Sequence, residues 1–461
     1  MKIESPFPWP GVVVLVSCLP AVQSLAVESL ESTNASVAQS LNWHVQNTDI
    51  IQGDPGFAAK YSGPQSLNSK GEVQETVTLD VFAGVGLWRG AEAHVDGLMA
   101  QGFGLSHTLG VEAFPNGDAN KAGNKVPYGM FAQLFIRQTI GFGGEQEDVP
   151  DGPLTLAGRR DVSRLTFTVG RFSSLDIVDN NAYANDPHRQ FMNWALMNNA
   201  TFDYPGDTTE YTTGFAAELN QANWALRYGF FQMPRDKNGW TAEDRFLKWP
   251  PEGSDGPFLR SWGMVAEFER RYSIHNHPGA IRFLAWLNEA HMASYQAALP
   301  ILLANGPGAD ISAARDYRYK FGFGLNWEQE LVHGVGVFGR WGWNDGQEET
   351  WEFTDINHYG SLGVSINGQA WRRPEDTFGL AGILGGASRA NQKFLEAGGN
   401  DLLDGDGALT YGLEKVLETY YDFKIWKTIH TTVDYQFVIN PAFNRDRGPV
   451  SIFGARVHWE F

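Results

Sequence analysis

Residues 163–197, SRLTFTVGRFSSLDIVDNNAYANDPHRQFMNWALM, join one clear strand to one long and unusual connection. Leu165, Phe167 and Val169 alternate with polar or small residues, which is the two-residue period of a strand with one apolar face. The connection mixes acids, amides and one arginine with several aromatic residues. Long connections are functional or disordered, and this apolar content argues against disorder. We therefore expect a loop that folds into the interior of a barrel and narrows it. The alternative is an outer loop packed on its own side chains.

The composition of the whole chain is that of a large antiparallel β protein. Its 461 residues include 52 glycines and 13% aromatic residues, but only 19% charged residues. No apolar run reaches the length of about 18 residues that a membrane helix needs. The formal net charge of −18 argues against a nucleic-acid partner, which requires a basic surface.

The N-terminal residues 1–26 have the features of an export signal peptide. Lys2 gives a positive start, residues 12–19 are apolar, and residues 24–26 fit a cleavage site between small residues. Residues 27–461 would then form the mature outer-membrane barrel domain. The one cysteine, Cys18, lies within the signal, so the mature chain could form neither a disulfide nor a thiolate metal site. A lipoprotein signal with Cys18 acylated stays open as an alternative.

Segments with alternating apolar residues recur along the chain, each near the ~9–11 residues of a tilted membrane strand. They are residues 41–52, 73–87, 88–100, 129–142, 162–172, 211–220, 223–233, 260–272, 280–291, 317–327, 332–343, 357–368, 377–387, 411–426, 431–439 and 451–461. This total of sixteen is even, as single-chain bacterial outer-membrane barrels require.

The connections between these segments alternate between long and short, as they do in outer-membrane barrels. Residues 143–161 break this rule, because they are long on the short side, and either a misplaced strand or an inserted plug segment would explain them. Residues 293–314 have a helical pattern within their loop, with Pro300 starting or kinking the helix, and we expect this helix to pack against other loops.

The last segment points to a membrane interface. Phe453, Val457 and Phe461 share one face, and the chain ends on an aromatic residue. Together with the signal and the even count, this predicts an all-β fold, a transmembrane antiparallel β-barrel of about 16 strands with an inward-folded constriction loop. We expect outer-membrane lipid around it and the barrel-assembly machinery as a partner of the strand ending in Phe461. A soluble two-sheet protein is the alternative.

Several short blocks resemble the carbohydrate-selective porin family, the OprB-type porins. The blocks are residues 87–92 (LWRGAE), 102–106 (GFGLS), 114–117 (FPNG), 137–141 (RQTIG), 163–166 (SRLT), 169–172 (VGRF) and 190–195 (QFMNWA). The resemblance implies an outer-membrane barrel of sixteen strands that passes small sugars by diffusion through a constriction of charged and aromatic side chains. The chain departs from the family at its start, where Asn42-Trp43-His44 replaces a Gly-Asp-Trp-Gly-Gly type of opening.

Strand parity and the expected loop together give candidate pore-lining residues. Arginine forks and carboxylates can bridge sugar hydroxyls, and charges on the polar side of a membrane strand must face water. The strand candidates are Arg137, Arg164, Glu218, Arg227, Glu267, Arg282 and Arg340; the loop candidates are Asp176, Asp179, Asn181, Arg189 and Trp194; the turn candidates are Arg89 and Glu92. We expect Asp176 and Asp179 to face Arg137 and Arg164. Trp194 either lines the channel or anchors the loop.

These observations favour passive, sugar-preferring permeation without a cofactor, a metal or an energy source. The alternative is a secreted β-rich glycosidase or sugar-binding protein. Enzyme motifs such as Gly-x-Ser-x-Gly, the P-loop and His-Glu-x-x-His do not occur, so no enzyme is predicted. Residues 401–407, DLLDGDG, faintly resemble a calcium-binding loop but lack its spacing and terminal Glu, which favours a solvated acidic loop.

Overall fold

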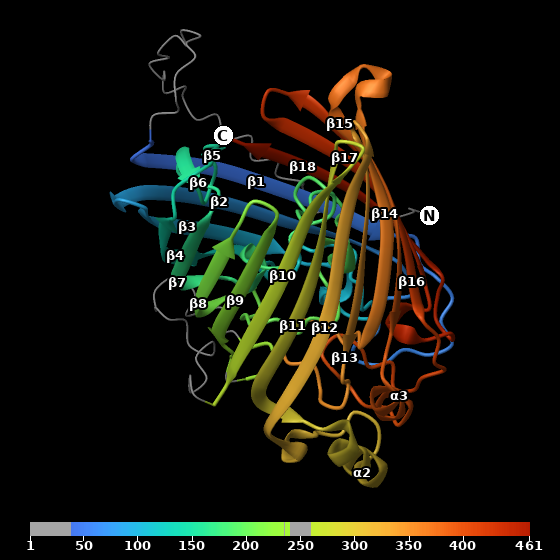
Figure 1. The fold of residues 1–461 in the computed structure, drawn as a ribbon. Coiled ribbons are helices and arrows are strands. Elements are labelled where there is room, and N and C mark those ends of the chain that lie inside the picture. The colour runs from blue at the N-terminus through green and yellow to red at the C-terminus, as the bar shows by residue number, and fades with distance from the viewer. Residues whose placement is uncertain (1–37, 235, 240–259) are drawn as a thin grey trace.

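The computed structural model closes sixteen antiparallel strands into one barrel (Figure 1). It describes residues 38–234, 236–239 and 260–461, so the predicted export signal lies outside the described residues and stays a prediction. The barrel strands are β1 (Leu41–Asp54), β2 (Glu72–Trp88), β3 (Ala91–Gly102), β4 (Asn124–Gly141), β7 (Arg164–Ser173), β8 (Tyr211–Asn220), β9 (Trp224–Gln232), β10 (Trp262–Ile274), β11 (His277–Ala293), β12 (Arg315–Val332), β13 (Val335–Asn344), β14 (His358–Gly368), β15 (Arg373–Gly386), β16 (Glu414–Trp426), β17 (Ile429–Ile439) and β18 (Val450–Glu460). The predicted fold class and strand number are confirmed.

The barrel closes where its first and last strands meet. Strand β1 pairs with β18, with Gln46 opposite Glu460 and Gly53 opposite Phe453. Just beyond β18, the backbone of Phe461 exchanges two hydrogen bonds with Val45, at 2.8 and 3.0 Å. Closure satisfies the backbone groups that an open sheet edge would leave exposed, and a membrane does not tolerate such an edge.

The outer face of the barrel is apolar. On β2, Val81 is 48% exposed, whereas its neighbours Asp80 and Phe82 are buried. The same alternation leaves Phe283 on β11 and Phe453 on β18 more than half exposed. Such a band of large apolar side chains is the surface that a barrel presents to lipid. No helix within the described residues is long and apolar enough to cross a membrane.

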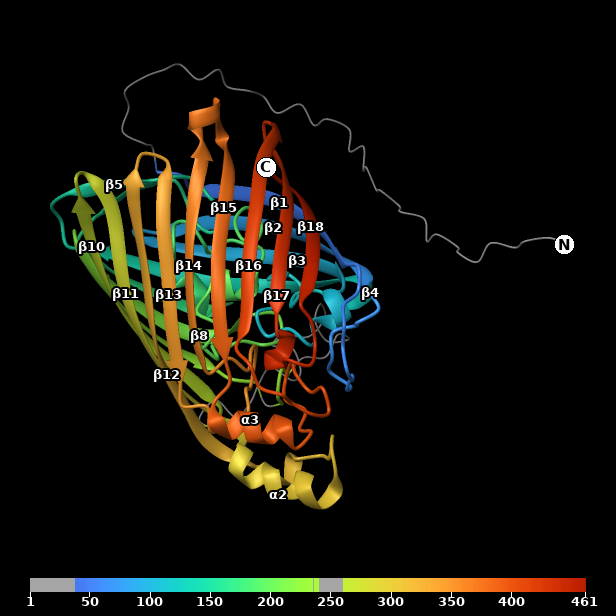
Figure 2. The same cartoon turned by 90° about the vertical axis from the view of Figure 1, so that its right-hand side faces the viewer.

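The two ends of the barrel differ (Figures 1 and 2). One end carries the long connections, including helices α2 (Tyr295–Asn305) and α3 (Arg389–Glu396). As predicted, α2 contains Pro300 and packs against another loop, with the Tyr295 and Phe394 rings 5.2 Å apart. The other end carries the short turns. Because long loops are extracellular in outer-membrane barrels, we call these ends extracellular and periplasmic.

Residues 143–161 form an inserted hairpin and not a misplaced barrel strand. Its strands β5 (Gln146–Val149) and β6 (Gly158–Asp161) pair only with each other. Figure 1 shows them at the periplasmic end, beside the first strands of the barrel. The tip is fixed to the barrel, because Asn42 donates to Asp151 at 2.9 Å and Arg137 donates to the Leu154 carbonyl at 2.8 Å.

Candidate constriction site

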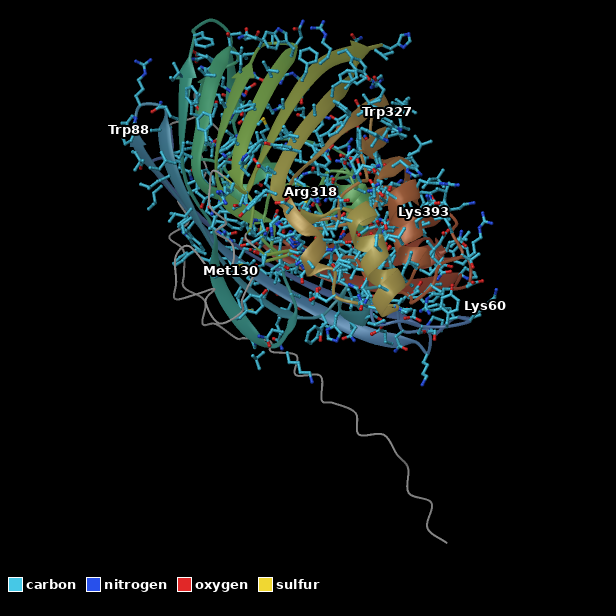
Figure 3. The ribbon with its side chains drawn as sticks, turned by 90° about the horizontal axis from the view of Figure 1, so that it is seen from below. Lys60, Trp88, Met130, Arg318, Trp327 and Lys393 are labelled. Carbon is cyan, nitrogen blue, oxygen red and sulfur yellow. The ribbon has the colours of Figure 1, made fainter. Side chains whose placement is uncertain are left out.

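The connection between β7 and β8, residues 174–210, lies inside the barrel, and we call it the inner loop. Phe191, Asn193, Leu196 and Tyr204 within it are fully buried. The expected inward-folded loop is therefore confirmed, and the alternative of an outer loop packed on its own side chains is excluded. Figure 3, seen from the extracellular end, shows side chains crowding the interior behind the helices.

The inner loop begins with a reciprocal cap at the end of β7. The Ser173 hydroxyl accepts from the Leu175 amide at 3.2 Å, and the Asp176 carboxylate accepts from the Ser173 amide at 3.1 Å. This Ser-x-x-Asp arrangement satisfies two backbone donors at once, so local sequence turns the chain inward at this point. Burial raises the pKa of Asp176 to about 6.

On one side, the inner loop is fastened to β12 and β13. Arg340 forms an ion pair with Asp179 at 3.1 Å and donates to the carbonyls of Ala184 and Leu196 at 2.9 and 2.6 Å. Asn326 donates to Asp179 at 2.8 Å and accepts from Asn181 at 2.8 Å. Arg340 and Asp179 are each 2% exposed. This contact is closed, so Asp179 does not face Arg137 and Arg164 as predicted.

On another side, the inner loop is held by β16, β17 and β18. Glu418 accepts from the amides of Met192 and Asn193 at 2.6 and 3.1 Å, and Gln436 accepts from the Asn193 side chain at 2.9 Å. Arg456 donates to the Gln190 carbonyl at 2.9 Å. The sequence prediction missed Glu418, Gln436 and Arg456, although their place on the polar side of their strands could have identified them.

Trp194 begins the short helix α1 (Trp194–Met197) and packs among aromatic rings. Its ring lies 4.7 Å from that of Phe114 and 5.0 Å from that of Phe353, in stacked arrangements. Asn193 caps the helix by accepting from the Ala195 amide at 3.0 Å. Trp194 is only 1% exposed, so its geometry supports the anchor interpretation and not the channel-lining one.

Open space remains on the side of the inner loop that faces β4, β7 and β8. This space, which we call the eyelet cavity, has a volume of about 220 Å³. Its lining comprises Lys121, Gln133, Ser173, Leu175, Asp176, Asp179, Asn185, Asp186, Pro187, His188, Met197, Asn198, Glu210 and Tyr211. The inner loop therefore narrows the barrel from one side and leaves a polar opening on the other.

Charges of both signs meet at the eyelet cavity. The Lys121 ammonium lies 3.2 Å from Asp118 and 3.9 Å from Glu210, and His188 lies 3.2 Å from Asp118. Burial alone would raise the pKa of Asp118, but Lys121 and His188 hold it below its usual value. Burial opposes the charged form of His188, yet Asp118 raises the pKa of its ring. Lys121 and His188 come from loops without a periodic pattern, so sequence reasoning had no signal for them.

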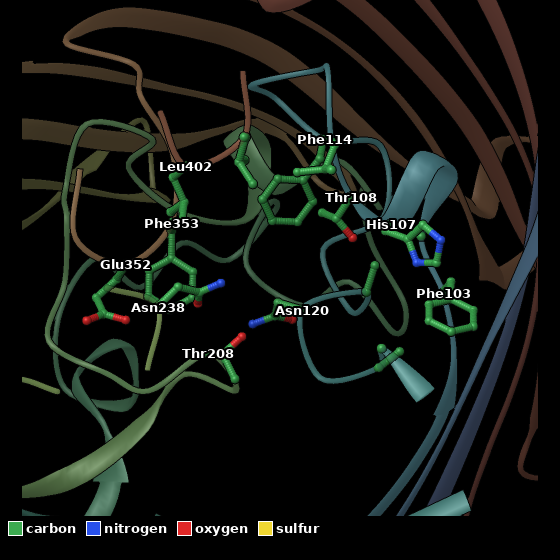
Figure 4. A pocket seen from close by; sticks show the side chains of 16 residues that line it. Phe103, His107, Thr108, Phe114, Asn120, Thr208, Asn238, Glu352, Phe353 and Leu402 are labelled. Atoms are coloured by element: carbon green, nitrogen blue, oxygen red, sulfur yellow. The ribbon is translucent and has the colours of Figure 1, made fainter. Parts of the chain in front are cut away.

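A second space lies among the extracellular connections that follow β3, β9, β13 and β15, and we call it the vestibule. It has a volume of about 250 Å³ and is lined by aromatic and polar groups. Figure 4 shows Asn120 and Thr208 beside this space, with Glu352 and His107 toward opposite sides. Asn120 and Lys121 are adjacent in sequence, so the two spaces share one loop.

Along the barrel wall from β8 to β12, charged side chains alternate in sign from strand to strand. We call this row the charge ladder; it comprises Glu218, Arg227, Glu267, Glu269, Arg282 and Glu328. Arg227 lies 2.7 Å from Glu267 and 3.1 Å from Glu269, while Arg282 lies 2.8 Å from Glu269. Among the predicted residues, Arg227 thus pairs with Glu218 and Glu267. The predicted Arg282 pairs with Glu269 and Glu328.

The remaining predicted residues lie at the periplasmic end. Arg89, Glu92 and Arg137 border a cavity of about 370 Å³ beside the β5–β6 hairpin, and Arg137 pairs with Glu92 at 3.0 Å. Arg164 pairs with Glu147 of the hairpin at 3.0 Å. Arg189 reaches from the inner loop to Glu460 at 3.2 Å. These residues are therefore separate from the eyelet cavity.

Comparison with known proteins identifies the family. A sequence model described as carbohydrate-selective porin, OprB family, matches residues 64–461. The chain belongs to this family. The high-pH structure of Pseudomonas putida OprB is similar with a TM-score of 0.67 at 14% identity, over 92% of this chain and 94% of that one. The Chlamydia abortus porin AaxA is 22% identical over 297 residues, which span 64% of this chain and 54% of that porin. The family and the fold are those of outer-membrane porins, which are channels and not enzymes.

Proposed function

We propose that this porin lets small neutral sugars diffuse passively across the outer membrane through the vestibule, the eyelet cavity and the cavity beside the β5–β6 hairpin. The observation that carries the proposal is the eyelet cavity itself. It combines an ammonium, carboxylates, amides and the ring of Tyr211 around about 220 Å³. The proposal also rests on membership of the carbohydrate-selective family.

The chemistry of this lining suits a hydroxyl-rich neutral solute. Lys121 and Gln133 offer donors, and Asp176 and Glu210 offer acceptors, while Tyr211 offers an aromatic ring. Rapid passage needs contacts that replace water without holding the solute, and several weak hydrogen bonds meet this need better than one strong site. No bond is made or broken, so the proposal requires no cofactor.

The predicted residues would then have three roles. Asp176 and Asp179 border the eyelet cavity, and Arg340 holds the inner loop that forms one side of it. Glu218, Arg227 and Arg282 would give a wall of paired charges. Arg89, Glu92 and Arg137 would line the exit. Asn181 and Trp194 would fix the inner loop without touching the solute.

Liposome swelling with sugars of graded size tests this function. We expect the purified porin to admit monosaccharides faster than larger sugars and faster than a charged solute of similar size. Lys121→Ala, which widens the eyelet cavity, should raise the rates for the larger sugars. Absence of swelling together with sugar hydrolysis would instead support the secreted glycosidase, and absence of swelling together with sugar binding would support the binding protein.

Two further partners follow from the outer surface. Outer-membrane lipid would cover the apolar band that includes Val81, Phe283 and Phe453, because the protein leaves about half of each of these side chains exposed. The barrel-assembly machinery would contact the C-terminal strand, where Phe461 is 65% exposed.

A further inference from the structure

Three buried carboxylates from three separate extracellular loops meet at one point. They are Glu112 between β3 and β4, Asp355 between β13 and β14, and Asp404 between β15 and β16. One ligand oxygen of each lies within 4.8 Å of the others. None of the three is more than 1% exposed. The residues are 49 or more positions apart in the chain, so their meeting is a product of the fold.

The surrounding backbone fixes two of these carboxylates and leaves their other oxygens unbound. Glu112 accepts from the Asp355 amide at 2.6 Å, and Asp355 accepts from the amides of Leu402 and Leu403, each at 3.2 Å. The second oxygen of Glu112, the second oxygen of Asp355 and both oxygens of Asp404 are buried without a hydrogen-bond partner. Four carboxylate oxygens are therefore oriented but unsatisfied.

Unsatisfied buried carboxylates are costly unless a cation or a proton compensates them. The neighbouring cation, Lys237, is already engaged by Asp401 at 2.5 Å and Glu349 at 3.1 Å. Within the described part of the chain, no Lys, Arg or His forms an ion pair with Glu112, Asp355 or Asp404. Burial, with repulsion from neighbouring carboxylates including Asp355, raises the pKa of Glu112 and Asp404. Burial and repulsion from Asp401 raise the pKa of Asp355 to about 7.

We propose that Glu112, Asp355 and Asp404 bind one Ca²⁺ ion that ties three extracellular loops together. The donors are all carboxylate oxygens, which hard cations prefer, and no cysteine or histidine belongs to the cluster. Ligands on opposite sides of Ca²⁺ lie ~4.6–5.2 Å apart, so oxygens within 4.8 Å of one another fit a single ion. Water supplies the remaining positions.

This site changes the interpretation of the DLLDGDG segment. The expectation of a solvated acidic loop is wrong, because Asp401, Asp404 and Asp406 are all less than 8% exposed. Asp401 pairs with Lys237, and Asp406 lies 3.3 Å from Arg447. Asp404 is therefore the one acid of the three that forms no ion pair with a described residue. The segment lacks the spacing of a calcium-binding loop because its partners come from other loops.

Calcium binding to the purified full-length porin in detergent tests the site directly. After treatment with EGTA and dialysis, the protein should bind one Ca²⁺ per chain in a calorimetric titration. The thermal midpoint of unfolding should be higher in millimolar CaCl₂ than in EGTA. Asp404→Asn should abolish both effects. Glu396→Gln, which removes an exposed carboxylate from α3 at the same end, should keep both.

The Asp404→Asn variant keeps the proposal falsifiable, because it relieves repulsion and should fold in EGTA at least as well as the natural chain. If the natural chain binds no Ca²⁺, or if Asp404→Asn binds it equally well, the proposal is overturned. A thermal midpoint of unfolding that does not change with Ca²⁺ but changes near pH 7 would also overturn the proposal. It would show that the three carboxylates share protons instead. Sugar permeation is a separate measurement, so failure of one proposal leaves the other intact.

Discussion

Asp179 of the inner loop and Arg340 of β13 form a buried ion pair with 3.1 Å between Oδ2 and Nε. The two residues are 161 positions apart, and their contact fixes the loop to the barrel wall from inside. A charge pair closed in this way cannot set a field across an opening. The other charged groups that line the eyelet cavity are Lys121, Asp176, Asp186, His188 and Glu210.

Removing the cation of this pair should loosen the inner loop. Arg340→Met leaves Asp179 buried without a countercharge, which costs about 3–5 kcal/mol. It also removes the donors to the carbonyls of Ala184 and Leu196. We expect a lower midpoint in thermal unfolding, read from heat-modifiable gel migration, together with a larger and noisier single-channel conductance.

Arg159→Met is the matched control. Arg159 and Asp148 form an ion pair at 3.4 Å whose side chains are 44% and 80% exposed, so its loss should cost less than about 1 kcal/mol. Equal effects of the two substitutions on the unfolding midpoint and the conductance would mean that the Asp179–Arg340 pair does not hold the loop.

Lys121 should control the ion preference of the eyelet cavity. It lies 3.2 Å from Asp118 and 3.9 Å from Glu210, so Lys121→Gln leaves both acids without this countercharge. The eyelet should then favour cations more strongly, because its local net charge becomes more negative. The reversal potential in a KCl gradient measures this change. Lys125→Gln, which changes an exposed lysine four residues further along the chain, is the control. If the natural chain and both variants have the same reversal potential, Lys121 does not line the pore.

The ion preference should also depend on pH through His188. Asp118 raises the pKa of the His188 ring despite its burial, with Asp186 acting in the same direction and Lys121 against it. Because the pKa is raised, the His188 ring stays protonated at pH values above the ordinary histidine pKa of about 6.5. As the pH rises further, the ring loses its positive charge and the stability that this charge contributes. The preference for cations should therefore increase as the pH rises above about 6.5.

His188→Gln should remove the increase in cation preference above about pH 6.5, so that the preference no longer changes with pH there. His333→Gln, a change at a turn residue whose side chain is 79% exposed, should keep the profile of the natural chain. A profile that survives in His188→Gln would assign the titration to another group.

The barrel itself could be predicted from sequence because the pattern is strictly local. Alternation places Val81 outward and Asp80 inward without knowledge of any partner. The same parity places Arg227 and Arg340 on the interior side, where the structure has them. The inner loop could be recognised because its aromatic residues required burial, and Phe191 is fully buried in the structure.

The pairing of charges could not be predicted in the same way. Parity says that Arg137 and Arg340 point inward, but it does not say which of them meets Asp179. That choice depends on the path of the inner loop across the barrel, and this path is set by scattered contacts such as Glu418 with the Met192 amide. The positions of Lys121 and Glu112 depend on irregular loops, which have no period to read.

Phe461 provides a test of barrel assembly. Its ring is 65% exposed and lies 5.3 Å from that of Trp43. Its backbone exchanges two hydrogen bonds with Val45, where the first and last strands of the barrel meet. Phe461→Ala keeps these backbone hydrogen bonds and removes only the ring, so refolding of the purified chain into detergent should be close to that of the natural chain. If the ring is also a recognition element for the assembly machinery, the amount of heat-modifiable barrel formed in cells should fall several-fold. Phe453→Ala removes an outward ring of 58% exposure from the middle of β18 and is the matched control. Equal barrel yields in cells from both variants would mean that Phe461 contributes only apolar surface and has no special role in assembly.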